Sequence, residues 1–355
     1  MRKITDKARF DRSQRRKARQ AHKSRKRWNA YVLWRNLNRA RPEEDQVLRE
    51  ARRGCVTVLA PEVLDLTNDT SKTVEFIDRL VDRFTDASIS KLIVDMRPVR
   101  RLSTESAIVL LARIGHAATT FRRTRRFYFA PRDPVVNEVL LKTGFYDHFP
   151  KFQKRFQQLD CLRKTFFHYR TGQLVDPEII GRLVEQFGDV MHWPPARTRG
   201  LYNALIECLT NVLGHAYPES SINHEGWAKN RWWIAGQWDS RTGEIWFCCF
   251  DLGVGIPKTI RVRWRDQPWL LGPTDEELIV KGVVEGAFSR LRKVTRGKGL
   301  PTLRRFVEDA NDGELLIVSD RSRCQFPHNG KPSVSSLATP LEGTLIVWAL
   351  KAGQP

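Results

Sequence analysis

The chain has 355 residues, 41% of them hydrophobic and 28% charged, with a formal net charge of +21. This length accommodates two domains that each bury a core, and the composition is ordinary for a soluble globular protein. No apolar run reaches the roughly 20 residues of a membrane-spanning helix, and the basic N-terminus lacks the apolar stretch of a secretory signal. The six cysteines include no Cys-x-x-Cys pair, which is typical of reduced thiols. We therefore expect a cytoplasmic protein that does not associate with a membrane.

The positive charge is concentrated at the N-terminus. Residues 1–41 contain 16 Lys and Arg residues against only Asp6 and Asp11. Such an arm is attracted to any polyanion through a salt-sensitive, sequence-independent interaction. No nucleic-acid-binding motif accompanies the charge. Two interpretations stay open: non-specific binding of nucleic acid through residues 1–41, and a solvated, partly helical tail without a dedicated partner.

Residues 54–152 predict an α/β unit in which strands alternate with helices. Apolar and β-branched runs predict the strands, and apolar residues at helical spacing predict the helices. The expected elements are a strand at 56–59, a helix at 74–84, strands at 92–94 and 127–129, and helices at 106–118 and 135–142. This alternation implies right-handed crossovers and helices packed on a sheet.

Three segments of this unit resemble the STAS domain of anti-sigma-factor antagonists, namely 92–96, 102–111 and 140–145. In that family a turn before a helix carries the phosphorylatable hydroxyl. Thr104 stands at the acceptor position here, whereas Ser103 replaces the family's Asp and Ser106 replaces its Gly. The resemblance implies a regulatory domain. It leaves open whether Thr104 accepts a phosphoryl group or whether the scaffold persists without the switch.

Residues 153–175 are interpreted as a connector, in which 166–169 are compatible with a strand. Residues 176–351 predict an α+β domain that begins with a helix after Asp176 and Pro177, an N-cap residue and a first-turn proline. Further elements are expected as helices at about 197–216 and 299–311 and strands at 231–238, 244–250, 314–318 and 344–350.

We expect the helices of this domain to lie on one face of a mixed, mostly antiparallel sheet. The Ser- and Pro-rich stretch 319–341 predicts a loop between the last two strands. Trp232 and Trp233 are adjacent in a strand and so point to opposite faces. We expect one of them to be exposed to a partner.

Three polar residues follow one stripe of the helix at 197–216, because Glu207, Asn211 and His215 are each four residues apart. The amide oxygen of Asn211 suits a Mg²⁺ ion that bridges phosphates. The Glu207 carboxylate can orient or deprotonate an attacking water or hydroxyl. His215, near the helix end, is better explained as a capping or packing residue.

An apolar strand at 245–250 ends at Asp251, and Gly253, Gly255 and Ile256 follow it. A carboxylate at this strand end can accept a hydrogen bond from the exocyclic amine of adenine, a contact that guanine cannot make. The glycines let the backbone turn closely under a base, and Ile256 adds an apolar contact.

A second glycine motif, made of Gly297, Lys298, Gly299 and Leu300, precedes a helix that has Pro301 in its first turn. Unpaired backbone amides at a helix start attract anions, which makes this segment a candidate seat for phosphates. Lys298 would add positive charge there.

In this order and spacing, the motifs resemble the GHKL ATPase superfamily, which includes DNA gyrase B subunits, histidine kinases and anti-sigma-factor kinases. The resemblance implies a Bergerat-type α/β sandwich, bound ATP and Mg²⁺, and a lid at about 257–296. It also implies that Asn211 is the metal ligand, that Glu207 is catalytic, and that Thr344, after Gly343, helps Asp251 to hold adenine through water.

The resemblance implies a bacterial regulatory protein that binds ATP and Mg²⁺, as an anti-sigma-like serine/threonine protein kinase controlled by its fused STAS-like domain. The alternative is an ATP-hydrolysing conformational switch that acts on a protein or nucleic-acid partner. A histidine kinase is less favoured. We find no H-box helix pair before Glu207, and Gly214 stands where those kinases usually carry a phosphate-contacting Lys.

Overall fold

A five-stranded antiparallel sheet organises the C-terminal part of the chain. Its strand order is β6–β7–β8–β10–β9, and all four pairings between neighbours are antiparallel. The expectation of a mixed sheet is therefore wrong for these strands. Their bounds are β6 Thr165–Gly172, β7 Trp232–Asp239, β8 Glu244–Asp251, β9 Glu314–Pro327 and β10 Ser333–Lys351.

The computed structural model describes residues 55–120, 125–148, 150–159, 165–218, 228–239, 243–263, 272–286 and 299–351. The basic arm at 1–41, part of the expected lid, and two residues of the second glycine motif, Gly297 and Lys298, lie outside these ranges. Strand β6 lies in the segment interpreted as a connector and forms one edge of the sheet.

The last two strands form a long hairpin where the sequence predicted a loop at 319–341. Strand β9 continues to Pro327 and β10 begins at Ser333, so the loop prediction is wrong for most of this stretch. Serines that suggested a loop are paired across the ladder instead, including Ser336 with Ser322. The ladder shifts register on both sides of Leu341. Pro340, which has no N–H to donate, lies within the first shift.

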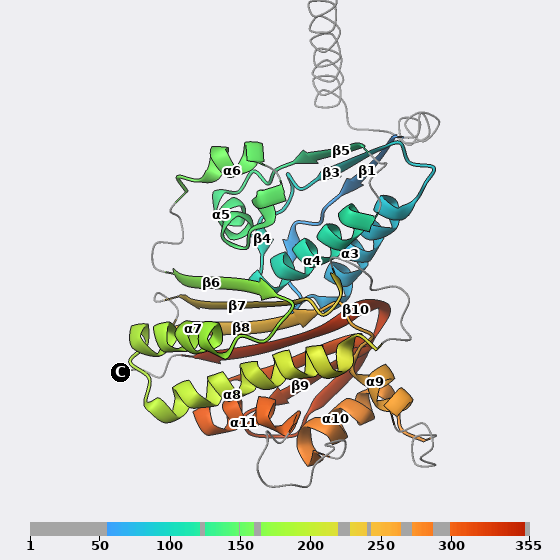
Figure 1. Ribbon diagram of the computed structural model, residues 1–355. Coiled ribbons are helices and arrows are strands. Elements are labelled where there is room, and N and C mark those ends of the chain that lie inside the picture. The colour runs from blue at the N-terminus through green and yellow to red at the C-terminus, as the bar shows by residue number, and fades with distance from the viewer. Residues whose placement is uncertain are drawn as a thin grey trace, which may run out of the picture. The chain divides into compact units, whose positions relative to one another are not determined.

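Helices cover one face of this sheet (Figure 1), where α8 packs against both α7 and α11. The predicted start of α7 is confirmed, because the Asp176 side chain accepts hydrogen bonds from the N–H groups of Glu178 and Ile179. The helix bounds are α7 Pro177–Val190, α8 Pro195–Asn211, α9 Ile256–Arg263, α10 Asp275–Glu285 and α11 Pro301–Ala310.

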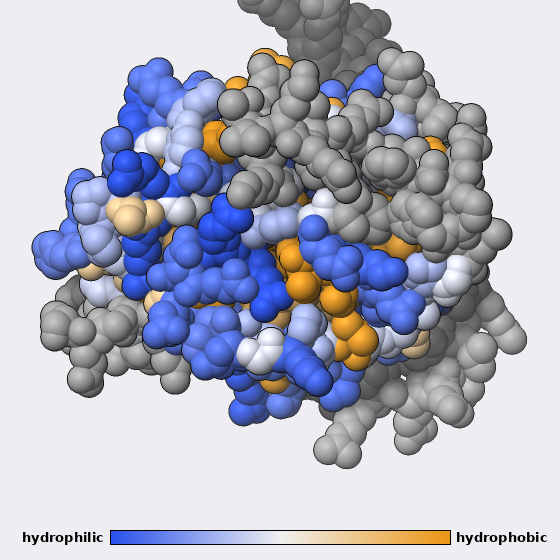
Figure 2. Space-filling model, turned by 90° about the horizontal axis from the view of Figure 1, so that it is seen from below, coloured by the Kyte–Doolittle hydropathy of each residue, from blue (hydrophilic) through white to orange (hydrophobic). Residues whose placement is uncertain are grey.

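The outward surface on the α10 and α11 side is largely hydrophilic. Figure 2 shows mostly hydrophilic side chains there, with a strip of apolar surface near the centre. Helix α11 turns Leu303, Phe306 and Val307 inward, where each is at most 2% exposed. This helix is therefore held by its apolar stripe against the sheet.

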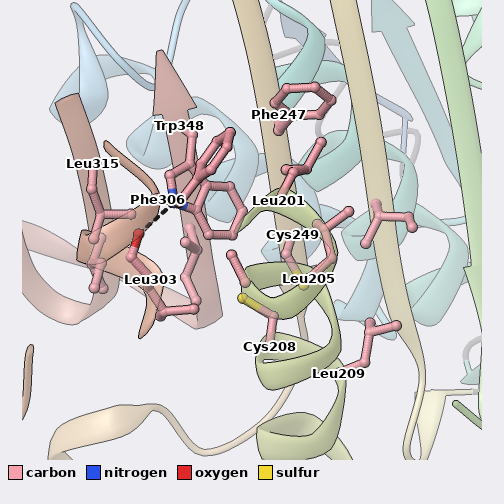
Figure 3. Packing of buried hydrophobic residues seen from close by; sticks show 14 of the residues in the cluster. Leu201, Leu205, Cys208, Leu209, Phe247, Cys249, Leu303, Phe306, Leu315 and Trp348 are labelled. Atoms are coloured by element: carbon pink, nitrogen blue, oxygen red, sulfur yellow. Dashed lines mark hydrogen bonds between the residues drawn. The ribbon is translucent and has the colours of Figure 1, made fainter. Parts of the chain in front are cut away.

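The core between these helices and the sheet is shown in Figure 3. Leu205 of α8 and Phe247 of β8 pack in the same cluster as Phe306 of α11. Trp348 of β10 is fully buried, and its Nε1 donates a 2.9 Å hydrogen bond to the carbonyl oxygen of Leu303. This bond satisfies the one polar atom of the indole and fixes α11 along β10.

The N-terminal α/β part shows the predicted alternation of strands and helices. Strands β1, β3 and β5 form a sheet in the order β1–β3–β5, with β3 and β5 parallel. Strands β2 and β4 form a small parallel sheet. The bounds are β1 Cys55–Leu59, β2 Val63–Leu64, α3 Thr70–Thr85, β3 Lys91–Asp95, β4 Arg101–Leu102, α4 Thr104–Thr120, β5 Arg125–Phe129, α5 Pro134–Lys142 and α6 Pro150–Phe156.

Helices α3 and α4 pack on the second face of the five-stranded sheet, against β7, β8 and β10. Trp232 and Trp233 are 3% and 1% exposed, so the expectation that one of them is available to a partner is wrong. The two faces of the central strands are both buried, and the described residues from Thr57 onward belong to one compact unit. Among the described residues, no helix is long and apolar enough to cross a bilayer.

Candidate functional site

Asp251 is the last residue of β8 and lies among buried neighbours. It is opposite Thr344 of β10 and Trp232 of β7 in the ladder, which puts its side chain on the sheet face that α8 covers. Its Oδ1 accepts a 2.7 Å hydrogen bond from the N–H of Gly253. Burial raises the pKa of Asp251 to about 7, and the bond from Gly253 opposes this shift only in part.

The loop after Asp251 is shaped by close approaches that only glycine permits. A Cβ atom on Gly253 would lie 2.5 Å from the Cβ and carbonyl oxygen of Ala216, and Gly255 has a φ of +88°. The N–H of Val254 donates a 2.8 Å hydrogen bond to the carbonyl oxygen of Ala216. The glycines therefore let this loop lie directly against the segment that follows α8.

A hydroxyl network links this loop to β9 and β10. The fully buried Ser319 Oγ accepts a 2.8 Å hydrogen bond from the N–H of Ile256. It also lies 3.1 Å from Thr344 Oγ1. Sequence reasoning missed Ser319 because it assigned this residue to a loop. The available signal was its position directly after the apolar run 315–318.

Tyr217 is a second residue that sequence reasoning missed. Its hydroxyl accepts a 3.0 Å hydrogen bond from the N–H of Leu252 and donates one of 2.8 Å to the carbonyl oxygen of Arg231. Burial, followed by the nearby Asp251 carboxylate, raises the pKa of Tyr217. The neutral phenol therefore persists as a donor and fixes the backbone beside Asp251.

Glu207 and Asn211 lie together at the C-terminal end of α8. The Asn211 Nδ2 donates a 3.2 Å hydrogen bond to Glu207 Oε1. Partial burial raises the pKa of Glu207, and the bond from Asn211 opposes the shift. Such a carboxyl can exchange a proton closer to neutrality than an exposed glutamate can.

A π turn, η2 (Val212–Ala216), follows Asn211 at once. This turn brings the carbonyl oxygen of His215 to within 3.4 Å of Thr259 Oγ1. The structure describes this segment as a π turn where the sequence predicted a continuous helix to residue 216. The same turn carries Ala216 to the glycine loop, and so joins α8 to Asp251.

The described part of the second glycine motif leads into α11. Gly299 has a φ of +71°, and its carbonyl oxygen accepts a 2.9 Å hydrogen bond from the N–H of Thr302. Leu300 packs against the core under α8. The structure thus brings the start of α11 to the helix layer that contains Glu207 and Asn211. Gly297 and Lys298 stay predictions.

Thr104, the match to a phospho-acceptor, lies at the start of α4 and is 7% exposed. Its hydroxyl donates a hydrogen bond to Gln237 Oε1 of β7. Gln237 alternates with the buried residues of the α8 side, so this contact lies on the face opposite Asp251. In this arrangement the hydroxyl is not accessible to a kinase.

A depression of about 630 Å³ lies where α7 ends and α8 begins. It contains none of the predicted site residues and is wide open to solvent. Its lining includes Asp189, His192, Trp193 and Arg199.

A scan of the sequence against models of known protein families found no match, and a search of curated proteins found none either. The interpretation of this site therefore rests on its own residues and their geometry.

Replacing Asp251 with Asn is expected to stabilise the protein without nucleotide, increasingly so at higher pH. The folded protein holds the Asp251 proton up to about pH 7, whereas the unfolded carboxyl has a pKa near 3.8. This raised pKa contributes stability below pH 4 that is lost as the pH rises to 7. Asn keeps an oxygen for the Gly253 N–H and carries no charge. The gain in unfolding free energy should grow between about pH 4 and 7, reach roughly 2–4 kcal/mol, and then level off.

Urea unfolding at several pH values checks this expectation, with the exposed carboxylate variant Asp309→Asn as the control. A gain that is the same at pH 5 and pH 8 would contradict a buried, proton-binding Asp251.

Gly343→Ala is expected to damage the site. Gly343 has a φ of +105°, and a Cβ atom there would overlap the carbonyl oxygen of Asp251. We expect a loss of roughly 1–3 kcal/mol in unfolding free energy from the strained backbone alone, and more from the overlap. Gly214→Ala is the matched control, since a Cβ on Gly214 meets nothing within 4 Å among the described residues. Equal stability of the two variants would show that β10 does not lie against Asp251.

Proposed function

We propose that this chain is an ATP- and Mg²⁺-binding regulatory protein of the GHKL type, acting as a serine/threonine protein kinase. The supporting observation is the buried carboxyl of Asp251 beside Thr344, at the point where a glycine loop meets the end of α8. Ligand sites use a few precisely placed polar groups to fix orientation, and a buried acceptor for the base close to groups for the phosphates is such an arrangement.

Recognition of the base is assigned to Asp251 and Thr344. An ionised Asp251 accepts a hydrogen bond from the exocyclic amine of adenine, and guanine presents a carbonyl oxygen there instead. Ser319 orients the Thr344 hydroxyl from 3.1 Å, and Ile256, held by Ser319, adds apolar contact. The network is prepared before nucleotide arrives, which reduces the entropic cost of binding.

The phosphates and the cation are assigned to the end of α8 and the start of α11. Asn211 donates its Nδ2 hydrogen to Glu207, so its amide oxygen is directed away from that carboxylate. No three Asp, Glu, His or Cys side chains converge as ligands within the described ranges. The donors assigned to the cation are the amide oxygen of Asn211, phosphate oxygens and water. This set fits Mg²⁺, which keeps several waters and binds phosphate oxygens. The ion would neutralise charge on the transferred phosphoryl group.

Glu207 is assigned to the activation of the attacking hydroxyl. Its raised pKa suits a group that takes the proton of a Ser or Thr hydroxyl on a protein partner as the γ-phosphoryl group is transferred. Asn211 holds this carboxylate through a 3.2 Å hydrogen bond. With water in place of the hydroxyl, the same arrangement hydrolyses ATP, which is the alternative function of a conformational switch.

Calorimetry should show that ATP binds more tightly than GTP. An unmet buried polar group costs about 1–3 kcal/mol, so GTP should bind roughly 5- to 150-fold more weakly. Asp251→Asn should remove most of this preference by weakening ATP binding. Equal affinities of the native protein for ATP and GTP would contradict the assignment of Asp251.

Glu207→Gln should retain ATP affinity within about twofold and reduce turnover by 100-fold or more, because only the transition state loses its base. Asn211→Ala should instead weaken nucleotide binding only when Mg²⁺ is present.

Incubation with γ-labelled ATP and a host extract, followed by phosphoamino-acid analysis, separates the two functions. Label on protein Ser or Thr supports the kinase, label found only as free phosphate supports the switch, and native turnover in Glu207→Gln refutes both.

A further inference from the structure

The part of the hairpin that carries Ser319 and Thr344 is held from its other side by α3 and α4. This segment is irregular: the ladder shifts register around Leu341, and Asp320 has a φ of +53°. Regular ladder bonds therefore do not fix its position alone. Contacts from outside the hairpin must contribute.

One such contact comes from Arg113 of α4, which is 5% exposed. Its guanidinium forms ion pairs with Glu342 of β10 and, at 3.3 Å, with Asp78 of α3. Burial lowers the pKa of Arg113 to about 10, so it remains charged at neutral pH. Glu342 immediately precedes Gly343 and Thr344. A buried charge that is paired with this residue constrains the backbone next to the site.

A second contact runs in the opposite direction, from Arg323 of β9 to the start of α3. Its Nε donates a 3.1 Å hydrogen bond to Thr70 Oγ1, and its NH2 group donates one of 3.0 Å to the carbonyl oxygen of Thr67. The neighbouring Ser322 points the other way and donates a 3.3 Å hydrogen bond to Glu276 of α10. The hairpin is thus clamped between α3 and α10.

We propose that Arg113 and Arg323 are positioning residues for the nucleotide site, through which the α3–α4 layer controls ATP affinity. Arg113 holds Glu342, and so keeps Gly343 and Thr344 against Asp251. Arg323 holds the β9 strand that carries Ser319. The inference rests on the proposed function. Regulation of that site is assigned to the contacts between these helices and the hairpin, and phosphorylation of Thr104 takes no part in it.

Displacing α4 from the hairpin should therefore weaken adenine binding without unfolding the sheet. The coupling energy expected between such neighbouring elements corresponds to about three- to tenfold in affinity. Because Thr344 is assigned to help Asp251 hold adenine through water, the change should appear in ATP binding and leave the weaker GTP binding unchanged. A residue with a purely structural role would lower both affinities together with the melting temperature.

Glu342→Gln in the full chain is the direct test, because the Glu342 side chain is 43% exposed and its replacement keeps the volume. Calorimetry should show ATP binding about three- to tenfold weaker and unchanged GTP binding, with a melting temperature lowered no more than in Asp78→Asn. Glu342→Asp should restore part of the ATP affinity. Asp78→Asn is the matched control: it removes the other partner of Arg113 without touching β10, and should leave ATP affinity unchanged.

Arg323→Gln provides a second, independent variant with the same expected loss of ATP affinity. Native ATP affinity in both Glu342→Gln and Arg323→Gln would overturn the inference, as would an equal loss in Asp78→Asn. Asp251→Asn separates this failure from that of the proposed function. If Asp251→Asn weakens ATP binding and the hairpin variants do not, only the inference of control by α3 and α4 is wrong.

Discussion

The structure depends on the burial of both faces of its central sheet. Helices α7, α8 and α11 cover one face, and α3 and α4 cover the other. Phe247 and Phe250 of β8, which point to opposite faces, are both at most 1% exposed. Because water is excluded along β8, the carboxyl group at its end loses hydration. That loss, more than any neighbouring charge, raises the pKa of Asp251. The same exclusion would strengthen the proposed hydrogen bond from an adenine amine to this carboxyl.

Burial at the end of β8 also constrains which residues can lie around Asp251. Each polar group near Asp251 needs a partner, and Tyr217 and Ser319 supply hydroxyls to the backbone on either side of it. The π turn after Asn211 brings α8 to the same loop. The groups assigned to base and phosphates thus share one scaffold, although they come from separate elements. Arginine contacts extend this scaffold to α3 and α4, and so connect the site to the N-terminal part of the chain.

The sequence predicted those features that depend on local physics. Apolar spacing located the helices, and a cap residue with a following proline located the start of α7. It could not predict the hairpin at 319–341, because Ser and Pro disfavour strands locally and only pairing with a distant partner stabilises them. Ser319 and Tyr217 were missed for a similar reason, since a single hydroxyl has no pattern. The covering of Trp233 by α3 and α4 is a long-range packing choice that no local window contains.

The protonation of Asp251 tests the account most directly. Carbon-13 NMR of protein labelled at aspartate carboxyl groups, with Asp251→Asn to assign the signal, measures its pKa with and without nucleotide. We expect a pKa of about 7 in the free protein and a clear decrease when ATP binds, because the adenine amine favours the ionised form. GTP should not produce this decrease. An ordinary pKa near 4 in the free protein, or a value that ATP leaves unchanged, would contradict the account.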